Sequence, residues 1–410
     1  MGLSTTRVAT PGLAAGQEEA MEVQESFASP KSWASKEMLA LFKKKEGCQA
    51  REILPPELWG RVIENLTAKQ RRPLFSVSKV FQEITQHAPV EVDLKNYRHE
   101  TREQLLARIG VFNNVRKLNL SGCRKLTAED IQAIVAKHPK LTYLNLSCCR
   151  QLTTEDIQNI VARLPQLTHL DLTECDQLTK LSLQAPNLTH LDLRKCKQLE
   201  TLLLQAKNLK YLGLASCMEL TTKEIQAIID KALNLEHLNL SSFFELTTLS
   251  IQAPHLKYLH LTGHPNLATF FIQAPKLTHL DLTCCNELTE LSIQANNLER
   301  LQLQFCNQLT KLSLLQANKL ERLDLTGCNK LEAKTIQTLL TQASNLTHLR
   351  LRYCWQLTKR SVQTSTFIGI QAIIAIASKL THLDIKWCNQ FTRDFIVGLR
   401  EQYPGVEIVW

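Results

Sequence analysis

The sequence predicts an α/β solenoid with a curved parallel sheet along one face and a convex side that mixes helices with extended segments. The main observation is a sequence motif that repeats along most of the chain. The motif is Leu-Thr-His-Leu-Asp-Leu-x-x-Cys, with small variations. Its apolar residues alternate with polar ones, as in a strand buried on one face. The segments between copies read either as helices or as further strands. The twelve copies start at Val115, Leu141, Leu167, Leu188, Leu209, Leu235, Leu256, Leu277, Leu298, Leu320, Leu346 and Leu380.

Positions one, four, six and nine of each repeat are apolar and are expected to point inward, and positions three, five, seven and eight outward. Residues 126–135 represent the helical connections, with Thr127 as a plausible N-cap. Residues 178–183 represent the extended connections, which are too short for a stable helix. Helical connections are expected in the repeats that start at Val115, Leu141, Leu209 and Leu320. Extended ones are expected in those that start at Leu167, Leu188, Leu235, Leu256, Leu277 and Leu298.

Ten of the 13 cysteines occupy position nine, where Phe243 and His264 stand in the other two repeats. A position that accepts Cys or Phe is selected for burial, so these thiols are interpreted as small core residues. Reducing surroundings are therefore expected, and the cytoplasm is the predicted location, with the nucleus also compatible. One cysteine per coil does not form a tetrahedral zinc site. The ten are Cys123, Cys149, Cys175, Cys196, Cys217, Cys285, Cys306, Cys328, Cys354 and Cys388.

The composition is that of a soluble globular protein, with 44% hydrophobic and 21% charged residues. No run of eighteen apolar residues predicts a transmembrane segment, and no secretory signal is visible. The net charge is +9, and most of the excess follows residue 110. This excess favours an acidic protein partner or a solvated face over nucleic acid.

We expect residues 1–30 to be disordered, residues 31–50 to form a short helix or linker, residues 51–88 a small helical domain and residues 89–410 the solenoid. The opening Met-Gly matches a short myristoylation pattern, which an ordinary terminus also matches by chance. Residues 51–88 read as three short helices with more apolar surface than they can bury among themselves. That surplus predicts docking, either to a partner or to the first repeats.

The array resembles the cysteine-containing leucine-rich repeats over about three hundred residues, which implies their curved solenoid. Residues 53–85 resemble an F-box through Leu54-Pro55-x-Glu57-Leu58, Val62-Ile63 and Val77-Ser78-Lys79-Val80-Phe81. The resemblance implies a Skp-type adaptor, a cullin beyond it and a protein substrate held for ubiquitination. Arg71 stands where the family favours an apolar residue, Arg72-Pro73 follows, and Phe81 replaces the usual Trp, which predicts weaker adaptor affinity. The implied adaptor-binding residues are Leu54, Pro55, Glu57, Leu58, Val62, Ile63, Leu66, Val77 and Phe81.

The concave face carries neighbouring His and Asp side chains at positions three and five, but no nucleophile is placed with them. They are interpreted as a duplicated polar ladder, so no catalytic residue, metal or cofactor is predicted. The C-terminal repeats gather Arg, Tyr and Trp, which dominate many protein interfaces. An insertion near residues 361–368 is either a surface loop or a binding loop. The predicted substrate-binding residues are Arg300, Phe305, Arg322, His348, Arg350, Arg352, Tyr353, Trp355, His382, Lys386 and Trp387.

The leading hypothesis is a non-catalytic substrate receptor of a Skp–cullin–F-box ubiquitin ligase. The alternatives are a protein-interaction scaffold without ubiquitin chemistry, a nucleic-acid-binding solenoid, and a bacterial effector that mimics a host F-box protein in the host cytosol. Residues 53–85 separate the first hypothesis from the scaffold.

Overall fold

The computed structural model describes residues 90–110, 112, 114–354, 368–388 and 391–410. The chain divides into two compact units, Met1–Val90 and Glu91–Trp410. The predictions for residues 1–30, 31–50 and 51–88, the adaptor-binding residues, Trp355 and the insertion near 361–368 lie outside the described residues.

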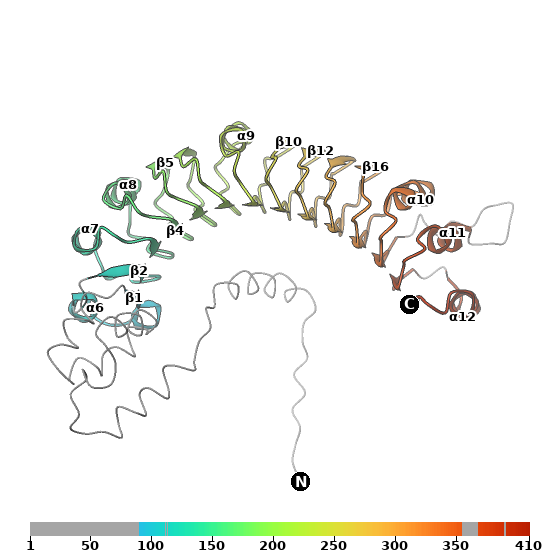
Figure 1. Ribbon diagram of the computed structural model, residues 1–410, viewed down its shortest axis with the longest axis horizontal. Coiled ribbons are helices and arrows are strands. Elements are labelled where there is room, and N and C mark those ends of the chain that lie inside the picture. Colours follow the sequence, from blue (N-terminus) through green and yellow to red (C-terminus); the bar gives the residue numbers. More distant parts are fainter. Residues whose placement is uncertain (1–89, 111, 113, 355–367, 389–390) are drawn as a thin grey trace, which may run out of the picture. The chain divides into compact units, whose positions relative to one another are not determined.

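One long sheet lines the concave face of the unit Glu91–Trp410 (Figure 1). It has fourteen strands, and the pairings from β2 to β20 are parallel and in register from repeat to repeat. Twelve of the strands belong to the regular repeats, and one more lies at each end. In order they are β1 (Val90–Asp93), β2 (Val115–Asn119), β3 (Tyr143–Asn145), β4 (His169–Asp171), β6 (His190–Asp192), β8 (Tyr211–Gly213), β9 (His237–Asn239), β11 (Tyr258–His260), β13 (His279–Asp281), β15 (Arg300–Gln302), β17 (Arg322–Asp324), β18 (His348–Arg350), β19 (His382–Asp384) and β20 (Glu407–Val409).

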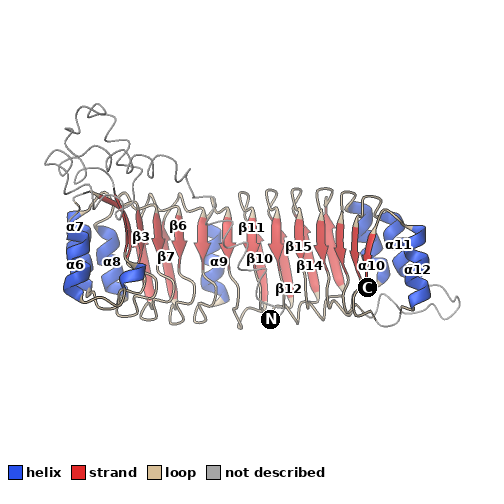
Figure 2. Ribbon diagram, turned by 90° about the horizontal axis from the view of Figure 1, so that it is seen from below, coloured by secondary structure: helices blue, strands red, loops and turns tan. Residues whose placement is uncertain are grey.

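The convex side alternates between helices and short strands, as the sequence predicts. Helices occupy both ends, and one stands between two groups of strands (Figure 2). The helices are α6 (Arg102–Gly110), α7 (Ala128–Lys137), α8 (Thr154–Ala162), α9 (Thr222–Lys231), α10 (Ala333–Gln342), α11 (Ile368–Ile376) and α12 (Arg393–Gln402), with a short 3-10 helix η3 (Lys95–Tyr97). The convex strands are β5 (Lys180–Gln184), β7 (Thr201–Gln205), β10 (Thr248–Gln252), β12 (Thr269–Gln273), β14 (Glu290–Gln294) and β16 (Lys311–Leu315). They form a sheet of two strands, β5–β7, and a sheet of four, β10–β12–β14–β16.

Side-chain caps mark the start of several helices. Thr127 accepts a hydrogen bond from the backbone N–H of Asp130, and the Asp130 carboxylate accepts one from Thr127, so α7 begins with a complete capping box. Thr153 with Asp156 and Thr221 with Glu224 repeat this arrangement at α8 and α9. These boxes satisfy backbone N–H groups of the first turn that would otherwise lack a partner.

The core is a stack of leucine layers. Positions one, four and six are buried in every regular repeat; in the repeat that starts at Leu141, Leu141, Leu144 and Leu146 are each 0% exposed. On the convex strand β10, Thr248, Ser250 and Gln252 are exposed while Leu249 and Ile251 face the core. The prediction of which positions point inward is therefore confirmed.

The position-nine cysteines are buried, and each thiol also donates a hydrogen bond. Sγ of Cys149, for example, lies 3.3 Å from the Leu120 carbonyl oxygen of the preceding coil. The remaining nine bonds reach the equivalent carbonyl at 3.0 to 3.9 Å. The thiols thus link consecutive coils, which the interpretation as plain core residues missed.

The C-terminal edge of the long sheet is covered by a side chain. Arg400 of α12 donates from Nη2 to the carbonyl oxygen of Ile408 at 2.7 Å and from Nε at 3.3 Å. An unpaired carbonyl on an edge strand can accept a hydrogen bond from another chain, and here the Arg400 guanidinium already donates to the Ile408 carbonyl oxygen.

Within the described ranges, no helix combines the length and the apolar character needed to cross a bilayer.

Candidate functional site

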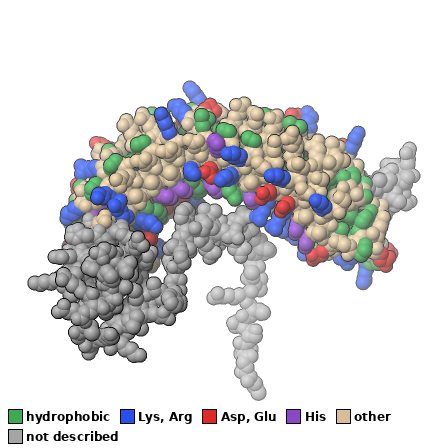
Figure 3. Space-filling view, viewed as in Figure 1, with side chains coloured by type: hydrophobic (Ala, Val, Ile, Leu, Met, Phe, Trp, Pro, Cys, Tyr) green, Lys and Arg blue, Asp and Glu red, His purple; other side chains and the backbone are tan. Residues whose placement is uncertain are grey.

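A row of aromatic rings runs along the middle of the concave face at position three. His169 and His190 stack with ring centroids 4.0 Å apart, and His237 and Tyr258 with centroids 4.4 Å apart. Seven successive repeats contribute a ring, and Figure 3 shows histidine side chains along the inner margin of the arc. The rings are Tyr143, His169, His190, Tyr211, His237, Tyr258 and His279. The row is therefore a continuous series of neighbouring rings, stacked at four of the six contacts and tilted at two.

The threonine at position two orients several of these histidines. The Thr168 hydroxyl donates to the Thr142 carbonyl oxygen at 2.8 Å, and its oxygen lies 2.8 Å from Nδ1 of His169. Because the hydroxyl proton is committed to the carbonyl, the oxygen accepts from Nδ1–H. The same pair of contacts occurs at His190, His279, His348 and His382. Nε2 is consequently the acceptor nitrogen of His169, His190, His279 and His348 when these rings are neutral.

Burial keeps the stacked histidines neutral. It is the largest cause that lowers the pKa of His169 to about 4, followed by the charge of His190. Burial likewise lowers the pKa of His237 and His279 to about 4. A general base at neutral pH needs a pKa near 7, so these rings are poorly suited to acid–base catalysis.

The Asp and Asn side chains at position five close the turn that follows each strand. Asp281 Oδ1, for example, accepts from the backbone N–H of Thr283 at 2.9 Å. Seven further repeats make this bond at 2.8 to 3.2 Å. A carboxylate that bonds the backbone two residues on forms an Asx turn, which is a structural role.

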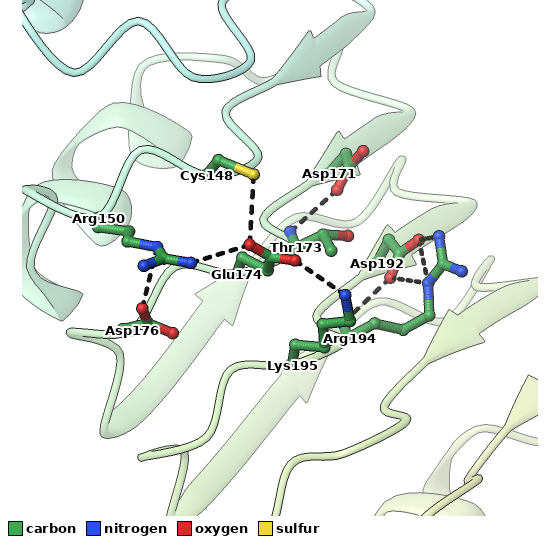
Figure 4. A network of polar contacts seen from close by, with 9 residues as sticks. All are labelled: Cys148, Arg150, Asp171, Thr173, Glu174, Asp176, Asp192, Arg194 and Lys195. Carbon is green, nitrogen blue, oxygen red and sulfur yellow. Dashed lines mark hydrogen bonds and ion pairs between the residues drawn. The ribbon is translucent and has the colours of Figure 1, made fainter.

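A charged network surrounds Glu174 near the N-terminal end of the face (Figure 4). Hydrogen bonds from Lys195 and then Arg150 lower the pKa of Glu174 to about 2. Arg194 binds Asp192 with Nε 2.9 Å from both carboxylate oxygens. The Cys148 thiol contacts Glu174 at 3.7 Å, and burial followed by that carboxylate raises its pKa. The thiol is therefore a poor nucleophile.

Position eight of all twelve repeats has a left-handed backbone, with φ from 57° to 75°. Nine of these residues are not glycine, although a side chain is unfavourable in this region. The backbone N–H bonds that hold the turn explain it, such as Cys148 N–H to the Thr173 carbonyl oxygen at 2.7 Å. Sequence reasoning missed this feature; the recurrence of glycine at Gly122, Gly263 and Gly327 was the available signal.

The C-terminal repeats present exposed aromatic residues at position eight. Phe305 is 42% exposed, Tyr353 37% and Trp387 58%. The rings of Tyr353 and Trp387 are nearly parallel, with an interplanar angle of 2° and centroids 6.0 Å apart. The structure thus brings these three predicted residues onto one row.

Arg350, Arg352 and Lys386, which are also predicted substrate-binding residues, form different hydrogen bonds. Arg350 Nη1 lies 3.3 Å from Oδ2 of Asp324, and Arg352 Nε donates to Oδ2 of Asp384 at 2.7 Å. Lys386 donates its backbone N–H to Asp384. The charges of Arg350 and Arg352 are therefore partly balanced within the chain, which the sequence prediction did not anticipate.

The remaining predicted residues lie at position three. Strand register places Arg300 beside Arg322, and Arg322 beside His348. The rings of His348 and His382 stack with centroids 4.1 Å apart, and Nε2 of His382 lies 3.1 Å from a carboxylate oxygen of Glu407.

A groove of about 1030 Å³ lies on the convex side between α9 and the sheet β10–β12–β14–β16. Its floor includes the hydroxyls of Thr248, Ser250 and Thr269 and the ring of Phe271, and Lys223 belongs to the α9 wall. The sequence does not predict this groove, because the groove forms only where a coil with a convex helix lies next to coils with convex strands.

No group of three or more His, Cys, Asp or Glu side chains among the described residues could hold a metal ion. Burial raises the pKa of the Cys123 thiol to about 11 and that of Cys217 to about 12. These protonated thiols are inert as nucleophiles.

The repeats, the parallel sheet and the buried core define a leucine-rich-repeat solenoid, a class of domain that is generally a non-catalytic protein-interaction module. Two family models match the chain: the one described as "At1g61320/AtMIF1, LRR domain" at residues 104–264, and the one described as "Leucine Rich repeat" at residues 273–293. Neither match covers residues 51–88.

Solved structures with similar repeats include three of diverse origin. The yeast Rad7 and Elc1 complex contains a chain with 17% identity, 93% coverage of both chains and a TM-score of 0.32. A leucine-rich repeat protein from Bacteroides ovatus has 11% identity, with 78% of this chain and 83% of that chain covered and a TM-score of 0.26. The functional domain of InlJ from Listeria monocytogenes, which includes a cysteine ladder, has 20% identity, coverages of 70% and 65%, and a TM-score of 0.21. No curated protein matches this chain.

Proposed function

We propose that this protein is the substrate-recognition subunit of a Skp–cullin–F-box ubiquitin ligase. In this proposal residues 51–88 bind a Skp-type adaptor, and the concave face of the solenoid binds a protein substrate. The observation that carries the proposal is the sequence Leu54-Pro55-x-Glu57-Leu58 with Val62-Ile63, which lies directly before a leucine-rich-repeat solenoid.

The chemistry of the solenoid supports a receptor rather than an enzyme. His169, His237 and His279 have lowered pKa values, and the position-five carboxylates close turns. The C-terminal repeats instead expose Phe305, Tyr353 and Trp387, which are residue types that supply much of the binding energy in protein interfaces. A ligase receptor needs such a surface and leaves catalysis to its partners.

The test is co-purification of the full chain with a Skp-type adaptor. We expect a stable complex, at least a tenfold loss of affinity in the double variant Leu54→Ala/Pro55→Ala, and unchanged affinity in Trp387→Ala. If the unaltered chain binds no Skp-type adaptor, the ligase proposal is wrong.

A scaffold without ubiquitin chemistry is the second candidate, favoured by the outward face of the repeats, which needs no adaptor to bind a partner. The same co-purification separates the two, because a scaffold retains its partner and lacks the adaptor. An origin as a bacterial effector would leave both binding surfaces unchanged and would direct them to a host ligase.

A further inference from the structure

The three exposed aromatics occupy an unfavourable backbone region. Phe305, Tyr353 and Trp387 have φ values of 61°, 57° and 66°. The left-handed conformation is unfavourable for a residue with a Cβ, and bulky side chains are uncommon there. Gly327, at the same position of the intervening repeat, shows that glycine also fits. The turn therefore does not require an aromatic side chain at position eight, and we call these three rings the aromatic row.

The absence of a side chain at Gly327 leaves room for the ring of Phe305 from the preceding repeat. A Cβ at Gly327 would lie 2.9 Å from Cδ1 of Phe305, so the Phe305 ring lies over the glycine backbone. Beyond this point the Tyr353 and Trp387 rings stack on each other. The Phe305 ring thus extends across the repeat that has no side chain at position eight.

A basic pair lies on the same strands at position three. Arg300 and Arg322 are register partners, and Arg322 is exposed. Within the described part of the chain Arg322 makes no ion pair, whereas Arg350 and Arg352 each contact an aspartate. The charge of Arg322 also contributes, after burial and His382, to the lowered pKa of the neighbouring His348. Arg322 is therefore a cation of this surface whose charge no described carboxylate balances in an ion pair.

Interspersed carboxylates make the surface unsuitable for nucleic acid. Asp324, Asp384 and Glu407 lie on β17, β19 and β20 of the same face. Nucleic-acid sites neutralise several phosphates with a run of cations, on the order of six to ten in strong binders. The charge of Arg322 beside an apolar row instead complements a peptide that carries both carboxylates and apolar side chains.

We propose that the aromatic row and the basic pair together bind an extended acidic peptide segment that runs across the strands of the C-terminal repeats. Its apolar side chains contact Phe305, Tyr353 and Trp387, and a carboxylate pairs with Arg322. Position three and position eight form parallel rows from repeat to repeat, so a segment that follows both rows lies along the solenoid. This inference rests on the proposed function for the role of the concave face, and it names the class of substrate.

The experiment selects random 12-residue peptides displayed on phage against the purified full chain, then measures the selected peptides by fluorescence anisotropy. We expect the selected sequences to combine Asp or Glu with Leu, Phe or Trp. Arg322→Glu and Trp387→Ala should each weaken them at least tenfold. Arg393→Glu, a charge reversal at an exposed site on α12, is the matched control and should leave affinity unchanged.

Gly327→Ala provides a second, indirect test. It should displace the Phe305 ring and weaken the peptides at least fivefold without removing any contacting side chain. Gly263→Ala is the control, because Gly263 has a φ of 75°, close to the 74° of Gly327. The atom nearest to a Cβ at Gly263 would be the Ser242 hydroxyl oxygen, at 3.5 Å. The backbone strain is then the same and the aromatic row is intact.

Three results would overturn the inference: selected peptides without acidic residues, affinities that Arg322→Glu leaves unchanged, or tighter binding of oligouridylate RNA than of any selected peptide. Recovery of no binding peptide would also overturn it. None of these assays contains an adaptor, so their failure is distinguishable from failure of the ligase proposal.

Discussion

The imidazole rings of His169 and His190 stack at 4.0 Å with an interplanar angle of 12°. Two protonated rings at that distance would repel each other, so the stack is stable only while the histidines are neutral. The relationship makes the concave face sensitive to acid.

Stability should fall between neutral and mildly acidic pH. His169, His237 and His279 have pKa values of about 4 in the fold, against about 6.5 when unfolded. The unfolded chain therefore binds more protons in this window, and the stabilisation present above pH 6.5 is lost progressively as the pH falls toward 4. We expect urea unfolding to give a lower free energy of unfolding at pH 5 than at pH 7.

The variant His169→Tyr/His237→Tyr/His279→Tyr tests the cause, because other repeats already carry Tyr211 and Tyr258 at this position. Its stability should change less between pH 7 and pH 5 than that of the unaltered chain. An equal change would assign the acid sensitivity to other groups. Glu174 and Glu236, with pKa values of about 2, lose their stabilising contribution below about pH 4.5 and so lie outside this window.

Native cysteine alkylation should be selective. The ten position-nine thiols are buried, whereas Cys148 and Cys284 are partly exposed. With iodoacetamide at pH 8 we expect mass spectrometry to show modification at these two and none at the ten until urea is added. Glu174→Gln should speed the reaction of Cys148, because removing that carboxylate charge lowers the pKa of the thiol. Labelling of Cys328 in the native protein would contradict the buried ladder.

The position-five turns should contribute measurably to stability. Asp281→Ala removes the oxygen that accepts from Thr283 N–H, and we expect a loss of about 1 kcal/mol in the free energy of unfolding. Asp281→Asn keeps an acceptor oxygen, as Asn145 and Asn239 do in other repeats, and should be nearly neutral. Equal losses in the two variants would show that the charge, rather than the turn, is important.

Arg400 should keep the chain from associating through its C-terminal edge. Arg400→Ala leaves the Ile408 carbonyl unpaired on β20, and we expect concentration-dependent self-association in sedimentation velocity experiments. Arg393→Ala, on the same helix, removes an exposed arginine that does not contact the edge. A monomeric Arg400→Ala protein would show that the edge is protected by other means.

The repeat architecture was predictable because period and burial are properties of the local sequence. Leu144 and Leu146 at fixed spacing predict a strand, and Thr153 with Asp156 predicts a capped helix. The partners of Arg350 and Arg352 were not predictable, because Asp324 and Asp384 lie 26 and 32 residues away and become neighbours only through strand register. The left-handed position eight escaped prediction because most of its residues have side chains, which usually avoid that conformation.

The repeats with a convex strand also have a constant length, which fixes the spacing along the solenoid. From Thr248 to Lys311 each convex strand pairs with the next at an offset of 21 residues, and the concave strands keep the same step. Gain or loss of one such coil changes the separation between the two ends of the solenoid by a single strand spacing, about 4.8 Å, while every remaining pairing keeps its register. Duplication of one repeat can therefore change the distance between the N-terminal repeats and the C-terminal surface without changing the residues of that surface.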